Sequence, residues 1–304
     1  MERARFLECS HCGLLADGLA LETGEVAALL ARSVRAEPFA LQPDGPVFLE
    51  SYTLRTLALS RDLIAIPADV AQRDALETPY QLLAATALLA PLEGIAPRPV
   101  SLVILCRPHE LEALEDLPLV LSAAFDDIVL VIDGGAVDGG GTAFRPSCHD
   151  AVRLVARPLA GDFAAQRNAG QDVARHDWVL QLDSDEALTP EALSSIGRVA
   201  ALADETGALS IGLPRQNLVD GRLSDLFPDI QYRLNRKTVR FAGLVHERPA
   251  LPRGWRDGFI APNLVIEHRL TRTHVEARSA GYDALAPGQG RMFERDDLLK
   301  PYRP

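Results

Sequence analysis

The sequence predicts an α/β protein whose central sheet is mainly parallel and is covered by helices on both faces. From residue 98 onward, short continuous apolar runs alternate with helix-like segments, the pattern of strands buried on both faces. Two of these runs end in an aspartate, Asp133 and Asp183. Open parallel sheets bind ligands beyond the carboxyl ends of their strands. We therefore expect a binding site at that edge of the sheet.

Composition limits the classes of protein that fit. The chain has 304 residues, of which 47% are hydrophobic, so it can bury a sizeable core. Its formal charge of −11 argues against a nucleic-acid partner, which would require a basic face. The longest apolar run, residues 80–92, is too short to span a membrane, and the N-terminus lacks a secretory signal pattern. We expect a cytoplasmic protein without a transmembrane segment, and peripheral membrane contact stays open.

The chain divides into three parts. Residues 1–97 form an accessory α+β segment of unknown role, with helix-like stretches at 23–34 and 78–90 around β-leaning stretches. A proline-containing stretch, residues 94–100, is the expected linker at the start of the main domain, residues 98–270. Residues 271–304 form a C-terminal tail.

The cysteines do not form a recognisable framework. A chain of this length with four cysteines is not a disulfide scaffold. Cys9 and Cys12 have the spacing of one knuckle of a zinc ribbon, but no second C-x-x-C pair exists. Ordinary thiols are favoured over a metal site at these two residues.

The main domain alternates strands with helices in order. We expect strands over 100–106, 127–133, 151–158 and 177–183, and helices over 111–125, 163–176 and 189–207. The last helix is the best marked, because Thr189 is a typical N-cap, Pro190 fits the first helical position and Gly207 fits the stop. Two further strands with a turn near "NRKT" are expected within 227–249.

An acidic cluster, "DSDE" at 183–186, follows the strand 177–183 and precedes the capped helix. It can be a solvated turn. Alternatively, carboxylates at i and i+2 can converge on Mg²⁺ or Mn²⁺, which bind through one or two carboxylates plus substrate phosphates. Close carboxylates need such a cation or hydrogen bonds to stay ionised. In the context of a parallel sheet, we favour metal and diphosphate binding at Asp183 and Asp185.

Two more groups of polar residues stand near this cluster in the predicted fold. Arg167 and Asn168 lie in the helix that precedes the acidic strand, either as a surface pair or directed at a phosphate and the neighbouring loops. His246 and Glu247 follow the predicted strand pair, and His268 lies further on. A neutral imidazole can complete a carboxylate metal site and a glutamate can act as a general base, although lone histidines are more often structural.

With these residues identified, the chain resembles glycosyltransferase family 2, which has the GT-A fold, over about residues 98–270. The resemblance lies in the order of the blocks "VSLVILC", "FDDIVLVIDGGAVDGG", "FAAQRNAG", "WVLQLDSDEALTPE" and "DIQYRLNRKTVRFAGLVHE". The combination of D-x-D-E with a downstream R-L-x-R and V-H-E is similar to the branch of bacterial lipopolysaccharide-core and cell-surface glucosyltransferases.

The resemblance implies roles for particular residues. Asp133 would hydrogen-bond the nucleobase, usually uracil, and Arg167 would lie near the nucleotide. Asp183 would face the ribose and the metal, and Asp185 would bind the Mn²⁺ or Mg²⁺ that bridges the diphosphate. His246 resembles the C-terminal metal or diphosphate contact of the family.

The activity implied is metal-dependent, inverting transfer of a sugar from a nucleotide-diphosphate donor, typically a UDP-sugar. The acceptor would be a hydroxyl of a glycan, a lipid-linked molecule or a cell-surface molecule. A carboxylate near the acceptor would act as base, and Glu247 is the leading candidate, with Glu186 and Asp229 as alternatives.

The sequence departs from the family pattern at Ala136, where a serine is usual. A separate alternative is a catalytically inactive GT-A domain that serves as a scaffold or binding module, and the presence of both D-x-D aspartates and of His246-Glu247 argues against it. A sugar-phosphate nucleotidyltransferase is less favoured, because no Gly-rich loop follows the first strand, residues 100–106. A Rossmann or methyltransferase reading fails because "DGGAVDGGG" contains no G-x-G-x-x-G.

Overall fold

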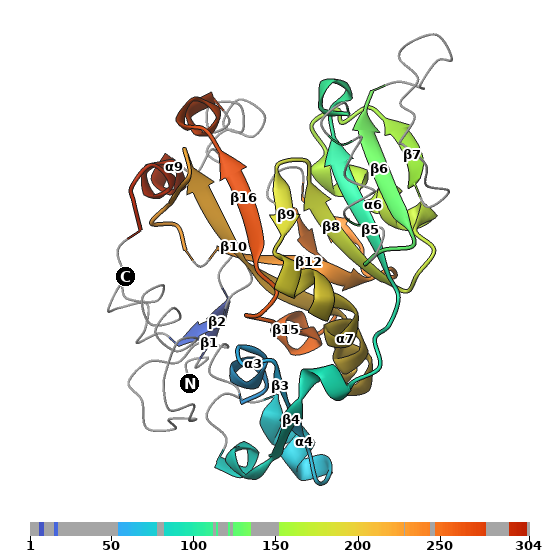
Figure 1. Cartoon of the computed structure of the whole chain (residues 1–304), viewed down its shortest axis with the longest axis vertical. Coiled ribbons are helices and arrows are strands. Elements are labelled where there is room, and N and C mark those ends of the chain that lie inside the picture. The colour runs from blue at the N-terminus through green and yellow to red at the C-terminus, as the bar shows by residue number, and fades with distance from the viewer. Residues whose placement is uncertain are drawn as a thin grey trace.

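A computed structural model describes most of the chain after residue 53 (Figure 1). The described residues are 6–8, 15–17, 54–77, 82–111, 114, 121, 124–134, 152–227, 229–243, 247–277 and 292–302. The expected helices at 23–34 and, for the most part, 111–125 lie outside these residues, as do Cys9, Cys12, Ala136 and His246.

The described elements alternate much as expected. The α-helices are α3 (Leu54–Leu59), α4 (Val70–Leu76), α6 (Phe163–Val173), α7 (Pro190–Thr206) and α9 (Met292–Leu298). The 3-10 helices are η2 (Leu82–Thr86), η3 (Leu92–Gly94), η4 (Pro108–Glu110) and η6 (Gly254–Asp257). The strands are β1 (Phe6–Glu8), β2 (Leu15–Asp17), β3 (Leu63–Ile66), β4 (Leu88–Pro91), β5 (Val100–Cys106), β6 (Ile128–Asp133), β7 (Val152–Arg157), β8 (Trp178–Asp183), β9 (Glu186–Leu188), β10 (Ser210–Val219), β11 (Arg222–Leu223), β12 (Asp229–Arg236), β13 (Phe241–Ala242), β14 (Arg248–Pro249), β15 (Gly258–Ile260) and β16 (Ile266–Leu270).

The main sheet has two halves. Its strand order is β7-β6-β5-β8-β12-β10-β16-β9, and β11 and β15 also pair with β10. The first four strands of this order are parallel to one another. In the second half, β12 runs antiparallel to both β8 and β10, whereas β16 is parallel to β10 and antiparallel to β9. The predicted α/β class with a mainly parallel sheet is confirmed, and the GT-A expectation agrees with it.

Both faces of the parallel half are covered, as the continuous apolar strands predicted. Along β5, Leu102 and Ile104 belong to the large core cluster that includes α7, whereas Val103 packs in a second cluster toward α6. Helix α6 approaches the sheet closely at Gly170, where an added Cβ would lie 2.3 Å from Val103. Only a residue without a side chain allows this approach.

Where the main domain is described, its strand and helix predictions hold closely. Strand β5 spans the expected residues 100–106, and α7 begins after Thr189, whose side chain accepts a hydrogen bond from the Ala192 N–H. Gly207 ends α7 in the left-handed conformation with a φ of 69°. Local capping signals were sufficient here because strand ends and caps depend on neighbouring residues.

The accessory segment differs from two local predictions. The expected helix over 78–90 is wrong from Leu88 onward: residues 82–86 form the short 3-10 helix η2, and strand β4, which pairs antiparallel with β3, then begins at Leu88. Residues 54–59, expected to be β-leaning, form α3, in keeping with their leucine, arginine and alanine content. Strand pairing with β3 outweighs the helix propensity of the later stretch.

The described part of the accessory segment packs on the main domain. Leu59, Ile64 and Leu92 belong to the same buried cluster as the sheet residues. Figure 1 shows α3 and β3 next to the end of the molecule that carries α7 and β15, and Arg55 stacks 4.5 Å from the ring centre of Phe259.

The end of the chain returns to the second half of the sheet. Helix α9 leads to Pro301, which forms a β-bridge with Ser224, and the Tyr302 N–H donates to the Leu223 carbonyl over 2.8 Å. The ring of Tyr302 meets that of Phe227 edge-on at 5.5 Å. The expected tail therefore contains an ordered segment, residues 292–302, that binds the loop between β11 and β12.

Candidate active site

The acidic cluster forms a tight turn between two strands of the same sheet. Asp183 ends β8 and Glu186 begins β9, and the Asp183 N–H donates to the Glu186 Oε2 over 3.1 Å. Strand β9 pairs with β16 so that Glu186 lies opposite His268. The turn is thus held by the parallel half of the sheet on one side and by β16 on the other, and its position is fixed.

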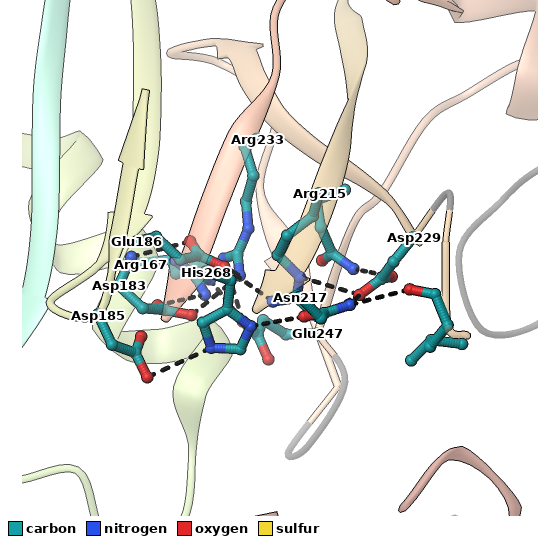
Figure 2. A network of polar contacts seen from close by, with 12 residues as sticks. Arg167, Asp183, Asp185, Glu186, Arg215, Asn217, Asp229, Arg233, Glu247 and His268 are labelled. Atoms are coloured by element: carbon teal, nitrogen blue, oxygen red, sulfur yellow. Dashed lines mark hydrogen bonds and ion pairs between the residues drawn. The ribbon is translucent and has the colours of Figure 1, made fainter. Parts of the chain in front are cut away.

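Three buried arginines surround this turn (Figure 2). Arg167 from α6 contacts the Asp183 Oδ1 at 2.8 Å, and Arg233 from β12 contacts the Asp183 Oδ2 at 2.9 Å. Arg215 from β10 contacts the Glu186 Oε1 at 2.8 Å. The positive charges of these guanidiniums offset the negative charges of the carboxylates at the end of the buried strand β8.

The carboxylates nevertheless remain crowded. Burial raises the pKa of Glu186 to about 7, the charge of Asp183 adds to the rise, and Arg215 opposes it. Burial also raises the pKa of Asp183; Arg167 opposes this rise and Asp185 adds to it. Three arginines thus do not fully offset the burial and mutual repulsion of the acidic groups. A group of this kind favours an additional proton or cation.

Asp185 points away from the arginines and toward a histidine. Its Oδ2 lies 3.3 Å from the Nε2 of His268, and the Nδ1 of the same ring lies 2.7 Å from the Oδ1 of Asn217. About a third of the Asp185 side chain is exposed, whereas His268 is buried. The carboxylate and the imidazole therefore meet at the border between the core and an open cleft.

That cleft is a cavity of about 440 Å³. It is lined by Leu105, Cys106, Arg107, Glu110, Val131, Asp133, Leu159, Phe163, Gln166, Asp183, Ser184, Asp185, His274 and Ala277. Asp133 and both aspartates of the D-x-D motif share it, as we expected from their positions after parallel strands. The Asp133 Oδ1 also accepts a hydrogen bond of 2.8 Å from the Leu159 N–H.

The three candidate bases have different surroundings. Glu247 accepts a hydrogen bond of 2.5 Å from the Arg167 Nε, and 11% of its side chain is exposed. The Glu186 side chain has no exposed surface, and that of Asp229 is 2% exposed. Arg215 contacts both. Among the three, Glu247 has the most exposed side chain, although it is not one of the residues that line the cavity.

Besides the direct contact of Arg167 with Glu247, helix α6 holds residues at and before β13. Asn168 makes a reciprocal pair with Phe241, donating to its carbonyl at 3.0 Å and accepting from its N–H at 2.9 Å. Gln171 donates to the Val239 carbonyl over 2.9 Å. These contacts hold Val239 and Phe241 against α6, so the alternative in which Asn168 bonds across the loops is the one observed.

Four residues of the site were missed by reasoning on the sequence: Arg215, Arg233, Asn217 and Glu110. Arg233 stands in the "RLNR" block that resembles the family, which was the only signal for it. Glu110, in η4, accepts a hydrogen bond of 2.7 Å from the Ser184 hydroxyl. His268 was noticed but not connected to Asp185, because the link depends on the pairing of β16 with β9.

The side chains at this site fit a hard divalent cation whose remaining ligands come from the substrate. Asp183, Asp185 and His268 offer oxygen and imidazole ligands, the types that Mg²⁺ and Mn²⁺ accept. Among the described residues, no group of three or more His, Cys, Asp or Glu side chains is arranged to hold a metal alone. The buried Arg167 Nη1 has no hydrogen-bond partner in the described part of the chain. A diphosphate would supply both the missing metal ligands and an acceptor for arginine.

Comparison with known proteins agrees with the resemblance found in the sequence. Residues 114–236 match the family described as "Glycosyl transferase family 2". This match supports the predicted class of enzyme, a glycosyltransferase, for the segment that it covers, which is less than half of the chain.

Individual relatives are distant or matched in part. A "TPR repeat-containing protein Synpcc7942_0270" of Synechococcus elongatus is 30% identical over 161 residues, covering 51% of this chain and 36% of the relative. The chain thus spans about a third of the length of that relative. Two crystal structures of S. aureus TarS, one of them titled as residues 1-349, align with TM-scores of 0.36 and 0.37 at 13% identity. They cover 66% of this chain and 42% and 69% of those chains, and this level of similarity supports no conclusion.

Within the described residues, no helix has both the length and the apolar character needed to cross a membrane. The predicted cytoplasmic location stays a prediction.

Proposed function

We propose that the protein is a metal-dependent, inverting glycosyltransferase that uses a nucleotide-diphosphate sugar, with uridine as the favoured nucleoside. One observation carries this proposal: the acidic turn at the end of β8 opens into a cavity of about 440 Å³ that also contains Asp133. That cavity brings a candidate nucleobase contact and candidate metal ligands to one side of the sheet.

The donor would lie along this cavity. Asp133 accepts a hydrogen bond from the base, and Asp183 faces the ribose. Asp183 and Asp185 would hold Mn²⁺ or Mg²⁺, with His246 as a further ligand by resemblance. When bound, such a cation supplies positive charge next to the diphosphate, which becomes more negative as the sugar departs.

The protein groups around the turn orient the donor and receive the acceptor proton. Arg167 Nη1 donates to a diphosphate oxygen, while its Nε keeps Glu247 in place. The Glu247 carboxylate removes the proton of the acceptor hydroxyl as the oxygen attacks the anomeric carbon from the side opposite the leaving group. The products are an inverted glycoside, a nucleoside diphosphate and a protonated Glu247.

The acceptor is proposed only as a class. A hydroxyl of a glycan or of a lipid-linked or cell-surface molecule fits the branch that the sequence resembles. The inactive-scaffold alternative would keep the same fold without metal-dependent binding of a nucleotide. The two alternatives differ in a measurable property, the effect of Mn²⁺ on nucleotide affinity.

The test is a panel of nucleotide sugars scored for Mn²⁺-dependent hydrolysis, together with titration of UDP with and without Mn²⁺. We expect hydrolysis of at least one UDP-sugar and, in Asp185→Asn, a fall in its rate of at least about 10–100-fold, the loss that is typical even for residues that only support a metal ligand. Asp172→Asn is the matched control, because Asp172 is an exposed residue of α6 whose ion-pair partner is Arg240. A wild-type protein that shows neither hydrolysis nor Mn²⁺-dependent UDP binding would refute the proposed transferase activity and support the inactive-scaffold alternative.

A further inference from the structure

A buried asparagine on β10 connects the candidate metal ligands to the interior of the sheet. Asn217 has no exposed surface. Its Oδ1 lies 2.7 Å from the His268 Nδ1, and its Nδ2 lies 3.1 Å from the Asp229 Oδ2 and 3.2 Å from the Leu226 carbonyl oxygen. Figure 2 shows Asn217 between Asp229 and the ring of His268, which faces Asp185 on its other side.

The partners of Asn217 determine which end of its amide faces the histidine. The Asp229 carboxylate and the Leu226 carbonyl can only accept hydrogen bonds, so both must face the NH₂ group. A rotated amide would direct its oxygen at these two acceptors and leave two buried N–H donors facing the ring. The amide oxygen therefore faces His268, and the Nδ1 of that ring must carry the hydrogen.

Asp229 is itself held as a fixed acceptor. Its Oδ2 accepts from the Arg215 Nε at 2.9 Å, and its Oδ1 accepts from the Gln231 Nε2 at 2.6 Å. Asn217 consequently cannot rotate without breaking hydrogen bonds inside the core. The chain from Arg215 through Asp229 and Asn217 fixes the orientation of the imidazole.

We propose that Asn217 is a positioning residue that fixes His268 in the Nδ1–H form, so that its Nε2 binds the divalent cation together with Asp185. A neutral imidazole carries one hydrogen, and with that hydrogen on Nδ1 the Nε2 lone pair is directed at the Asp185 carboxylate 3.3 Å away. The Nε2 lone pair and the carboxylate are both hydrogen-bond acceptors, and a cation between them stabilises their close approach. This inference rests on the proposed metal-dependent function and adds His268 and Asn217 to it.

The same arrangement recurs at metal sites in general, where the second ring nitrogen of a ligating histidine donates to a carbonyl or carboxylate oxygen. Loss of such a partner typically costs about 10–100-fold in metal affinity. At this site the partner is an amide oxygen rather than a carboxylate, which spares the crowded acidic turn another negative charge.

The test uses Mn²⁺ as the probe with the full chain, and reads the ¹⁴N coupling of the bound ion by pulsed electron paramagnetic resonance together with its affinity. Asn217→Leu removes the acceptor at similar volume. Gln231→Leu is the matched control, because it also removes an amide donor from Asp229 without contacting His268. We expect ¹⁴N coupling in the wild type and Gln231→Leu, and its loss in Asn217→Leu with Mn²⁺ binding weakened about 10–100-fold.

A second measurement does not depend on how the variants fold. In metal-free wild type, long-range ¹H–¹⁵N correlation of the His268 ring should show hydrogen on Nδ1. A ring with hydrogen on Nε2 and none on Nδ1 would overturn the inference. So would an Asn217→Leu protein that keeps wild-type Mn²⁺ affinity and ¹⁴N coupling.

The outcomes also separate this inference from the proposed function. A wild type that binds no Mn²⁺, alone or with UDP, refutes both. Mn²⁺ that binds without ¹⁴N coupling and is lost in Asp185→Asn refutes the role of His268 and leaves the metal-dependent transferase intact. Coupling that disappears in His268→Ala and in Asn217→Leu supports both.

Discussion

At the scale of single residues, the site consists of charges that compensate one another across the sheet. Arg167 is the central residue, because it contacts Asp183 and Glu247 with separate nitrogens. Arg215 has an equivalent role on the other side, between Glu186 and Asp229. Such paired carboxylates and arginines are costly to separate, because removal of one partner leaves a buried charge. We expect substitutions here to affect folding and function together, with Glu247 as the informative exception.

Glu247→Gln tests the proposed base. The substitution keeps the size of the side chain and an oxygen for Arg167, but removes the group that takes the acceptor proton. We expect kcat to fall by about 10²–10⁴ while KM for the nucleotide sugar changes little. Steady-state kinetics with Glu205→Gln as control checks this, since Glu205 is exposed on α7. An unchanged kcat would show that Glu247 is not the base and that another group takes the acceptor proton.

Asp127 offers a pH-dependent prediction far from the site. Burial disfavours its ionised form, but hydrogen bonds from Ser101 and the Arg175 N–H, together with Arg153, outweigh this and lower its pKa. A lowered folded-state pKa contributes stability that is present above the unfolded-state value and is lost as the pH falls through the folded-state value.

We therefore expect Asp127→Asn to lower the free energy of unfolding by about 1–3 kcal/mol at pH 7. The difference from wild type should shrink below the usual carboxyl pKa of about 3.9. Urea unfolding at pH 7, 5 and 3.5 measures it. A difference that grows on acidification would contradict the assignment of an ionised Asp127.

Residues adjacent in sequence were predictable, and residues joined by strand pairing were not. Asp183 and Asp185 were recognised because they follow an apolar strand and precede a capped helix. Arg215, Arg233 and His268 reach the turn only because β10, β12 and β16 stand in a particular order in the sheet. No local pattern encodes that order, so these contacts required the structure.

At the scale of elements, α6 is the part that joins the sheet to the site. Its inward face contacts β5 and β6 at Gly170, and one turn earlier it presents Arg167 to the acidic turn. Its polar side chains hold Val239 and Phe241, and its Arg167 binds Glu247 directly. A shift of this helix would move both groups at once.

Gly170→Ala should produce such a shift, because its Cβ would collide with Val103 and Val131. We expect a loss of about 1–3 kcal/mol in the free energy of unfolding, as for overpacked cores, and a weaker affinity for UDP with Mn²⁺. Denaturant unfolding and UDP titration measure the two effects. Gly94→Ala is the control, since nothing lies within 4 Å of its Cβ position. Equal stability of the two variants would show that α6 can move without cost.

At the scale of the whole molecule, the accessory segment shares the hydrophobic core of the sheet. The sequence suggested a linker near residues 94–100, and the Arg98 N–H instead donates to the Gly197 carbonyl of α7 at 2.9 Å. Such contacts depend on long-range packing, which composition and proline content do not reveal. The described part of the segment and the main domain should therefore unfold together.

Leu92→Ala tests this coupling, because Leu92 is 2% exposed and packs in the shared core. We expect a loss of about 2–5 kcal/mol and a single transition by both tryptophan fluorescence and circular dichroism. Leu88→Ala, at a residue 67% exposed, should change stability by less than about 0.5 kcal/mol. Two separate transitions in wild type or Leu92→Ala would mean that the segment folds on its own.

The turn that carries Ser184 and Asp185 has a consequence for evolution. Strands β8 and β9 on its two sides are locked in register by different neighbours, β5 and β16. Inserting or deleting one residue between them would turn the side chains of one strand to the opposite face of the sheet. Descendants of this protein can therefore exchange residues within the turn but cannot change its length, whereas loops outside the sheet are free to grow. The length of this turn should mark true relatives even where its residues differ.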